Sequence, residues 1–235
     1  AADQARFRDL VARRADGVPA AYLTGSAHFF GLVLDVTPAV LVPRPETELL
    51  AAWAIERVGA RRGVCDVLDV GTGSGAVAVA VASHAPAARI HATDLSRAAL
   101  DVATANAARL GLADRTAFHR ADLLPEAPTR FDVVVANLPY VGADDLCEVA
   151  PDVARWEPRA AWYAGRDGLR AIRRLVARLP GRLAAGADVG IEIGWRQGPE
   201  AVALVEKAFP GARVALLADL AGLPRLVTVE GVRDG

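Results

Sequence analysis

The strongest constraint on the fold is a regular alternation of short apolar segments and longer helical segments that begins at residue 64. Short apolar runs predict buried strands, and the segments between them have the length and composition of helices. This pattern predicts an α/β fold, a mostly parallel, doubly wound sheet with helices on both faces. The expected strands are VCDVLDV (64–70), RIHATD (89–94), TAFHRAD (116–122), RFDVVVAN (130–137), DVGIEIG (188–194), RVALLAD (213–219) and RLVTVE (225–230). The expected helices are AVAVAVASHA (76–85), SRAALDVATANAARLG (96–111), GLRAIRRLVARL (168–179) and GPEAVALVEKAF (198–209).

The N-terminal part of the chain has a different pattern. A short amphipathic helix is broken by Gly17 and Pro19, and it has little to pack on. A hairpin follows, with strands expected near 28–36 and 39–42 around Thr37-Pro38. The expected organisation is a remnant or shortened N-terminal helical segment (1–27), a β-hairpin linker with the PRPETE loop (28–47) and the main α/β domain (48–235).

The composition limits the possible partners. The chain is 53% hydrophobic, so it can form a full core, and its net charge of −1 argues against a direct nucleic-acid substrate. No apolar run approaches ~18 residues, so we expect no membrane association and a cytoplasmic location. Neither the histidines nor the cysteines have the spacing of metal ligands, and no metal is expected. These residues are His28, His84, His91, His119, Cys65 and Cys147.

A glycine-rich loop, DVGTGSGA (69–76), lies between the first strand of the main domain and the following helix. Gly71 and Gly73 permit a tight turn and close approach of a ligand, and Gly75 permits close helix packing. Asp94 ends the next strand, where a carboxylate can bind both hydroxyls of a ribose. The same spacing also fits a dinucleotide-binding loop, so the loop alone does not decide the cofactor.

Asp69 favours S-adenosylmethionine over a dinucleotide. A carboxylate at the start of the loop would repel a pyrophosphate, whereas it would attract a ligand that carries an ammonium and a sulfonium group. Asp122 ends the third strand, and we expect it to border the adenine pocket together with Leu123. The expected cofactor is therefore S-adenosylmethionine, with S-adenosylhomocysteine as its product.

The fourth strand ends in Asn-Leu-Pro-Tyr (137–140), at the edge of the sheet where ligands of α/β folds bind. The side-chain oxygen of Asn137 can accept a hydrogen bond. Pro139 holds Leu138 extended and leaves its carbonyl free to accept another. Tyr140 offers a flat surface for a planar group. These four residues, the predicted catalytic residues, indicate a clamp for a planar amine or amide beside a methyl donor.

Six segments follow one another in an order that resembles the HemK/PrmC family of protein-(glutamine-N5) methyltransferases. That family methylates the glutamine of the GGQ motif in peptide chain release factors. The segments are LVPRPETELL, LDVGTGSGA, TDLS..AL, ANLPY, EP..A...GRDGL and IEIGWRQG. The resemblance extends along almost the whole chain and implies a Rossmann-like S-adenosylmethionine-dependent methyltransferase fold over 48–235, with an antiparallel last strand.

The resemblance also implies roles for individual residues. The cofactor would lie on Gly71, Thr72, Gly73, Ser74, Gly75, Asp94, Leu123 and Asn137, together with Asp69 and Asp122. The substrate glutamine would lie on Asn137, Leu138, Pro139 and Tyr140, with Arg44 and Glu46 of the PRPETE loop facing the substrate.

Two departures from the family pattern affect these expectations. Leu138 stands where the family usually has proline; the carbonyl is kept and only rigidity is lost, so we expect the chemistry to be retained. The family also normally carries an N-terminal helical bundle, and this chain begins near what would be its last helix. We expect this difference to affect recognition of the release factor more than catalysis.

Two other functions remain open from the residues. Asn-Leu-Pro-Tyr also occurs in proteins similar to rRNA adenine dimethyltransferases, so an adenine N6-methyltransferase acting on RNA or DNA is the main alternative. That function requires a basic groove, which the net charge does not favour. A nicotinamide-dependent oxidoreductase fits the glycine loop but leaves the Asn-Leu-Pro-Tyr corner unexplained.

Overall fold

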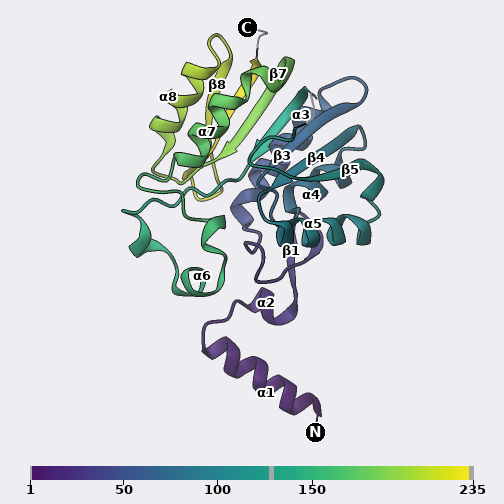
Figure 1. Ribbon diagram of the computed structural model, residues 1–235, viewed down its shortest axis with the longest axis vertical. Coiled ribbons are helices and arrows are strands. Elements are labelled where there is room, and N and C mark those ends of the chain that lie inside the picture. Colours follow the sequence, from purple (N-terminus) through teal and green to yellow (C-terminus); the bar gives the residue numbers. More distant parts are fainter. Residues whose placement is uncertain (1, 127–129, 233–235) are drawn as a thin grey trace.

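The computed structural model describes residues 2–126 and 130–232, and its centre is a seven-stranded sheet (Figure 1). The strands lie in the order β5-β4-β3-β6-β7-β9-β8. Their bounds are β3 Cys65–Val70, β4 Ala88–Asp94, β5 Thr116–Arg120, β6 Phe131–Ala136, β7 Leu183–Glu192, β8 Arg213–Ala218 and β9 Pro224–Val232. Each of these strands overlaps a strand predicted from the apolar pattern.

Strand direction confirms the expected methyltransferase-like sheet. Strands β5, β4, β3, β6 and β7 are parallel neighbours, whereas β9 is antiparallel to both β7 and β8. The last strand is therefore the antiparallel one. It lies between β7 and β8, and not at the edge of the sheet.

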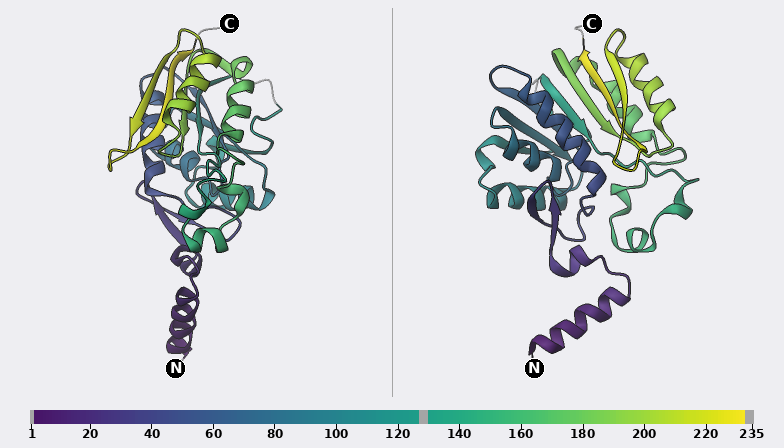
Figure 2. Two further views of the ribbon diagram at one scale, coloured as in Figure 1. Left: turned by 90° about the vertical axis from the view of Figure 1, so that its left-hand side faces the viewer. Right: turned by 180° about the vertical axis from the view of Figure 1, so that it is seen from behind.

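Helices cover both faces of the sheet, as Figure 2 shows from two further directions. On one face, α3 and α4 pack against side chains such as Val67 and Val133, and on the other α7 and α8 pack against Leu68 and Val134. Successive residues of one strand point to opposite faces, so both faces of β3 and β6 are buried. The main helices are α3 Glu48–Gly59, α4 Ala76–His84, α5 Arg97–Arg109, α6 Pro151–Trp156, α7 Arg170–Arg178 and α8 Gly198–Ala208.

The N-terminal elements lie beside the sheet and beyond it. Helix α1 (Ala2–Ala15) projects away from the sheet and buries none of its residues, and the short α2 (Ala20–Thr24) follows it (Figure 1). No helix in the described part of the chain is long and apolar enough to cross a membrane.

The hairpin forms earlier in the chain than predicted. Its strands are β1 (Ser26–Phe29) and β2 (Leu32–Asp35), and the turn is at Phe30-Gly31. The prediction that the hairpin turns at Thr37-Pro38 was therefore wrong. The chain does turn there, with the Val40 amide donating to the Thr37 carbonyl at 3.1 Å, but residues 39–42 form no strand. Gly31 has a φ of +74°, and the Phe30 amide donates a 2.7 Å hydrogen bond to Glu48 at the start of α3, which stabilises the turn.

The order of the strands determines where a ligand can bind. The chain passes from β3 to β4 and β5 on one side, and then returns to place β6 on the other side of β3. Such a reversal opens a crevice at the carboxyl ends of the two central strands. Because Val70 pairs with Ala136, the glycine loop and Asn137 leave the sheet at the same level.

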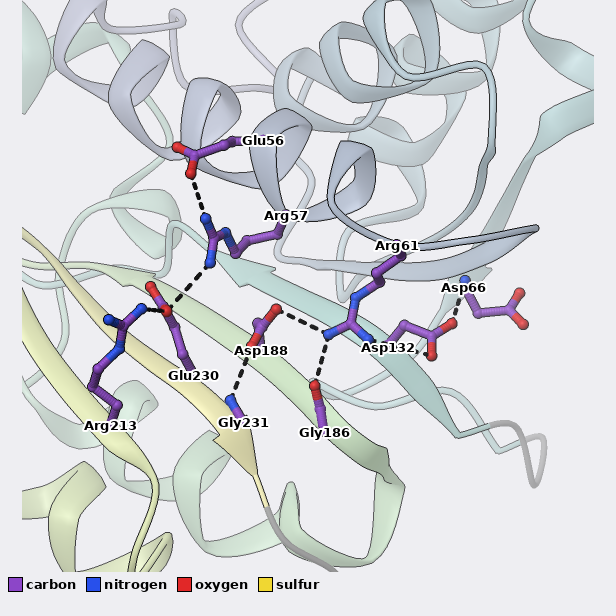
Figure 3. A network of polar contacts seen from close by, with 10 residues as sticks. All are labelled: Glu56, Arg57, Arg61, Asp66, Asp132, Gly186, Asp188, Arg213, Glu230 and Gly231. Atoms are coloured by element: carbon purple, nitrogen blue, oxygen red, sulfur yellow. Dashed lines mark hydrogen bonds and ion pairs between the residues drawn. The ribbon is translucent and has the colours of Figure 1, made fainter.

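A network of ion pairs and hydrogen bonds lies at the other end of the central strands, away from the crevice (Figure 3). Asp188 is largely buried and accepts hydrogen bonds from Arg61 (2.9 Å) and from the Gly231 amide (3.0 Å). Asp132 accepts a 2.8 Å hydrogen bond from the Asp66 amide. These contacts join β3, β6, β7 and β9 at the end of the sheet away from the crevice. They stabilise the sheet and do not occupy the carboxyl ends of the central strands.

Candidate active site

The glycine loop is shaped by close contacts that only glycine permits. Gly71 has a φ of +76°, and a Cβ there would lie 2.9 Å from Cδ2 of Leu138. Gly75 has a φ of +81°, and its Cβ would lie 3.1 Å from that of Ala103 on α5. The first glycine therefore lets the loop touch the Asn-Leu-Pro-Tyr corner, and the second lets α4 pack closely on α5.

Asp94 lies at the end of β4 and faces the glycine loop. Its two carboxylate oxygens accept hydrogen bonds from the amides of Gly73 (3.0 Å) and Ser96 (2.8 Å). These contacts fix the carboxylate and leave further lone pairs for hydroxyl donors, since an ionised carboxylate has about four acceptor positions. Asp94 lines a cavity of about 420 Å³ between the glycine loop, the ends of β4 and β6, and the loop after β5; we call it the cofactor cavity.

Asp69 lies beneath the loop and also lines the cofactor cavity. It is 2% exposed, and burial raises its pKa to about 6. The Thr72 hydroxyl donates to its carboxylate at 2.7 Å, and a hydrogen bond with the Ala78 backbone also favours the charged form. Asp69 therefore stabilises the loop itself; its predicted role toward a cationic cofactor stays a prediction.

The predicted adenine residues lie at the far side of the cofactor cavity. Leu123 is buried and has a φ of +71°, an unusual conformation for a residue with a branched side chain, and its carbonyl accepts a 2.6 Å hydrogen bond from Thr93. Asp122 is exposed, and its carboxylate is paired with Arg174. The backbone at Leu123 is thus held in place, whereas the side chain of Asp122 already has a partner.

Asn137 contacts Thr47, a residue that was not among the predicted site residues. Its Nδ2 donates a 2.9 Å hydrogen bond to Oγ1 of Thr47, which is buried where η1 (Pro45–Thr47) meets α3. No described residue donates to Oδ1 of Asn137 or to the Leu138 carbonyl. The two acceptors expected from the sequence are therefore unpaired at the carboxyl edge of the sheet.

Tyr140 is held at its hydroxyl and at its carbonyl by residues that were not among the predicted site residues. Its hydroxyl lies 3.4 Å from Oε1 of the buried Glu192, and burial with the nearby carboxylate raises its pKa above the ordinary value for tyrosine. Its carbonyl accepts a 2.8 Å hydrogen bond from Nε2 of Gln197. Gly168 packs on the same carbonyl, and a Cβ there would lie 2.0 Å from the oxygen. Gly168 and Gln197 belong to the GRDGL and IEIGWRQG segments, to which the sequence alone assigns no role.

The PRPETE loop lies beside the Asn-Leu-Pro-Tyr corner. Arg44 forms a 2.5 Å ion pair with Glu157, whose side chain is 2% exposed and also accepts a hydrogen bond from the Val42 amide. Arg44 lines the site, but its charge is matched there. Glu46 is exposed and does not line either cavity of the site within the described residues. The substrate-facing roles of both residues stay predictions.

A second cavity of about 260 Å³, here called the acceptor cavity, lies on the other side of the corner. It is mainly apolar, with Val141, Val153 and Trp162 among its lining residues. Both cavities are lined by Asn137 and Leu138, whereas Pro139 lines the cofactor cavity and Tyr140 the acceptor cavity. The Asn-Leu-Pro-Tyr corner is thus the shared wall between two hollows.

Comparison with known proteins supports a methyltransferase. Residues 67–156 match the family described as "Methyltransferase domain". The chain is 45% identical to the release factor glutamine methyltransferase of Bordetella pertussis over 96% of this chain and 82% of that protein. The chain belongs to the release factor glutamine methyltransferase family. A relative with the same name from Burkholderia pseudomallei is 44% identical over 96% of this chain and 80% of its own length.

Solved structures agree on the fold of this family member. A T. thermophilus 16S rRNA N2 G1207 methyltransferase in complex with AdoMet and guanosine superposes with a TM-score of 0.62 at 19% identity, covering 87% of this chain and 49% of that one. The predicted family resemblance and enzyme class are confirmed.

We expect the residues around the cofactor cavity to bind S-adenosylmethionine, and an exchange of Asp94 tests this expectation. Replacing Asp94 with alanine should weaken binding of S-adenosylmethionine by about 1–3 kcal/mol, because hydrogen bonds from ribose hydroxyls to a charged acceptor would be lost. Titration calorimetry would measure the change, with Asp101→Ala as the control because that carboxylate is exposed on α5 and paired with Arg97. Equal affinities for the two variants would remove Asp94 from the ribose site.

Proposed function

We propose that the protein transfers the methyl group of S-adenosylmethionine to the side-chain amide nitrogen (N5) of the glutamine in the GGQ motif of a peptide chain release factor. The observation that carries this proposal is the pair of cavities that meet at Asn137 and Leu138. In a direct methyl transfer the donor and the acceptor must approach each other from opposite directions. The two cavities lie on either side of Asn137 and Leu138 and so allow this approach. A release factor substrate also places the enzyme in the cytoplasm.

The two unpaired acceptors of the corner suit the amide of glutamine. Oδ1 of Asn137 and the Leu138 carbonyl can each accept one hydrogen of an NH₂ group, while Tyr140 provides a flat surface beside it. The lone pair of an amide nitrogen is delocalised, as in a peptide bond. Two fixed acceptors orient the NH₂ group and stabilise the positive charge that develops on nitrogen.

The cofactor would supply the chemistry that the chain itself lacks, an electrophilic methyl group on a sulfonium. The residues of the chain orient the nitrogen and exclude water. The methylated nitrogen becomes acidic and loses its proton afterwards, so a strong general base is not required. The Leu138 carbonyl can accept a hydrogen bond as the carbonyl of a proline would. The side chain of Leu138 is buried and packs against Gly71.

The charges around the acceptor cavity favour a protein over a nucleic acid. Of the described residues, three arginines line this cavity, and each is paired with a carboxylate of the chain: Arg44 with Glu157, Arg196 with Glu148 (2.6 Å) and Arg225 with Asp219 (3.1 Å). A flipped adenine requires phosphate contacts beside the pocket, which paired arginines provide poorly. A glutamine at the tip of a glycine-containing loop requires only a narrow, mainly apolar entrance.

The proposal is tested with labelled S-adenosylmethionine. The purified protein should label a release factor and fail to label the same factor with the GGQ glutamine replaced by alanine. Total RNA and DNA, offered in parallel, should stay unlabelled, and peptide mass spectrometry should place the methyl group on that glutamine. Label in RNA or DNA adenine and none in the factor would instead establish the adenine N6-methyltransferase.

A further inference from the structure

The direction in which the Asn137 amide points decides whether it can act on a glutamine nitrogen. Its oxygen must face the acceptor, because the NH₂ group in that place would meet the NH₂ group of the substrate donor to donor. A rotation of 180° about the last side-chain bond exchanges the two. Since both ends of an amide have nearly the same shape, only hydrogen bonding distinguishes them.

Thr47 alone does not settle this direction. Its Oγ1 lies 2.9 Å from Nδ2 of Asn137, and the residue is 4% exposed. A hydroxyl group can donate as well as accept, so a free hydroxyl would pair with either end of the amide. Thr47 selects the amide end of Asn137 only if its own hydrogen is committed elsewhere.

Glu192 has a carboxyl oxygen that can accept the hydroxyl hydrogen of Thr47. It ends β7, is 1% exposed, and its Oε2 has no hydrogen-bond partner among the described residues. A buried acceptor without a partner carries a large desolvation cost. Burial raises the pKa of Glu192 to about 7, and interaction with the Thr47 hydroxyl opposes this rise. The orphaned oxygen and the uncommitted hydroxyl hydrogen therefore complement each other.

The same carboxyl group also contacts the second member of the clamp. Oε1 of Glu192 lies 3.4 Å from the hydroxyl of Tyr140, on the side of the acceptor cavity. Of the neighbouring charged groups, Arg225 favours the ionised form of Glu192 and Glu46 disfavours it. One buried carboxyl group thus contacts Tyr140 directly and has a free acceptor oxygen that the Thr47 hydroxyl can use.

We propose that Glu192 and Thr47 are positioning residues, which fix the Asn137 amide with its oxygen toward the acceptor nitrogen. Neither residue touches the reacting atoms. The hydroxyl of Thr47 donates to Glu192 and can then only accept from Nδ2 of Asn137, so Oδ1 is left facing the substrate. The inference rests on the proposed function for its kinetic consequence, whereas the hydrogen-bond arrangement itself can be observed without a substrate.

The test uses two exchanges at Thr47 and a matched control. Thr47→Val keeps the shape and removes the hydroxyl, so kcat should fall about tenfold, the equivalent of one hydrogen bond to a charged network. Thr47→Ser restores the hydroxyl and should keep kcat within about threefold of wild type. Thr228→Val is the control, because Thr228 is also buried in the sheet and its hydroxyl has no hydrogen-bond partner in the described part of the chain. Cofactor affinity should change little in all three variants.

Glu192 is tested by Glu192→Gln, which keeps the volume. The amide of glutamine can donate to the Thr47 hydroxyl, which is then free to donate to either end of the Asn137 amide. We therefore expect kcat to fall about five- to tenfold, with an unfolding temperature close to that of wild type. The two side-chain NH resonances of Asn137 in a ¹⁵N-labelled sample provide a readout independent of activity. Both should shift in Thr47→Val and Glu192→Gln, and stay in place in Thr228→Val.

The outcomes separate this inference from the proposed function. Unmoved Asn137 resonances in Thr47→Val, or a kcat within threefold of wild type, would overturn the positioning role. A wild-type protein that fails to methylate a release factor would contradict the proposed substrate, while the resonance shifts would still report whether Asn137 is held as inferred.

Discussion

Replacing Asn137 with alanine should lower the turnover number by at least about 10², the usual loss when one preorganised charge-stabilising group is removed. Its Oδ1 has no hydrogen-bond partner among the described residues, and Asn137 lies on the wall shared by the two cavities. Removing it leaves the acceptor nitrogen with one hydrogen-bond acceptor, the Leu138 carbonyl, and with less stabilisation of the developing positive charge. Single-turnover kinetics with saturating cofactor would measure the chemical step directly.

The internal control for this variant is cofactor binding. Asn137 is one of many residues that line the cofactor cavity, so the dissociation constant of S-adenosylmethionine should rise by no more than a few-fold. A rate within a few-fold of wild type would show that the clamp does not act on the nitrogen. A rate loss matched by an equal loss of cofactor affinity would place Asn137 in binding alone.

Most of the sheet could be predicted because its evidence is local. Strands β3 and β6 are short, mostly apolar segments, and helices are bounded by recognisable caps, such as Ser96 at the start of α5, whose hydroxyl accepts from the Ala99 amide. The hairpin turn was misplaced for an equally local reason. Thr37-Pro38 has the composition of a turn, whereas Phe30, with a φ of +48°, does not.

The parts of the site that could not be predicted depend on contacts across the chain. Thr47 and Glu192 meet Asn137 and Tyr140 only because β6 and β7 are neighbours and α3 begins above them. A lone buried glutamate in an apolar strand has no sequence signal that distinguishes it from an ordinary edge residue. The glycine loop and the Asn-Leu-Pro-Tyr corner, by contrast, are contiguous, and their chemistry can be read from a few adjacent residues.

Replacing Gly168 with alanine should disable the clamp from a position outside it. The new Cβ would lie 2.0 Å from the Tyr140 carbonyl oxygen and 2.4 Å from Nε2 of Gln197, so the backbone at Tyr140 must move. Displacement of a substrate-positioning residue by about 1 Å costs on the order of 10² in rate, and we expect a loss of that size in kcat. The clash and the positive φ of +72° should together lower the free energy of unfolding by about 2–4 kcal/mol.

Gly165→Ala separates the displacement of Tyr140 from general backbone strain. Gly165 lies in the same loop and has a φ of +88°, but a Cβ there would meet only the Arg170 side chain at an ordinary 3.8 Å. That variant should lose about 1 kcal/mol of stability and keep its rate within a few-fold. If the two variants lose equal activity, strain in the loop is sufficient and the contact with Tyr140 is not the cause. Both variants should bind the cofactor normally, and only Gly168→Ala should lose its rate. That result would show that the GRDGL segment acts through Tyr140, whose carbonyl is held in place by Gln197 and Gly168.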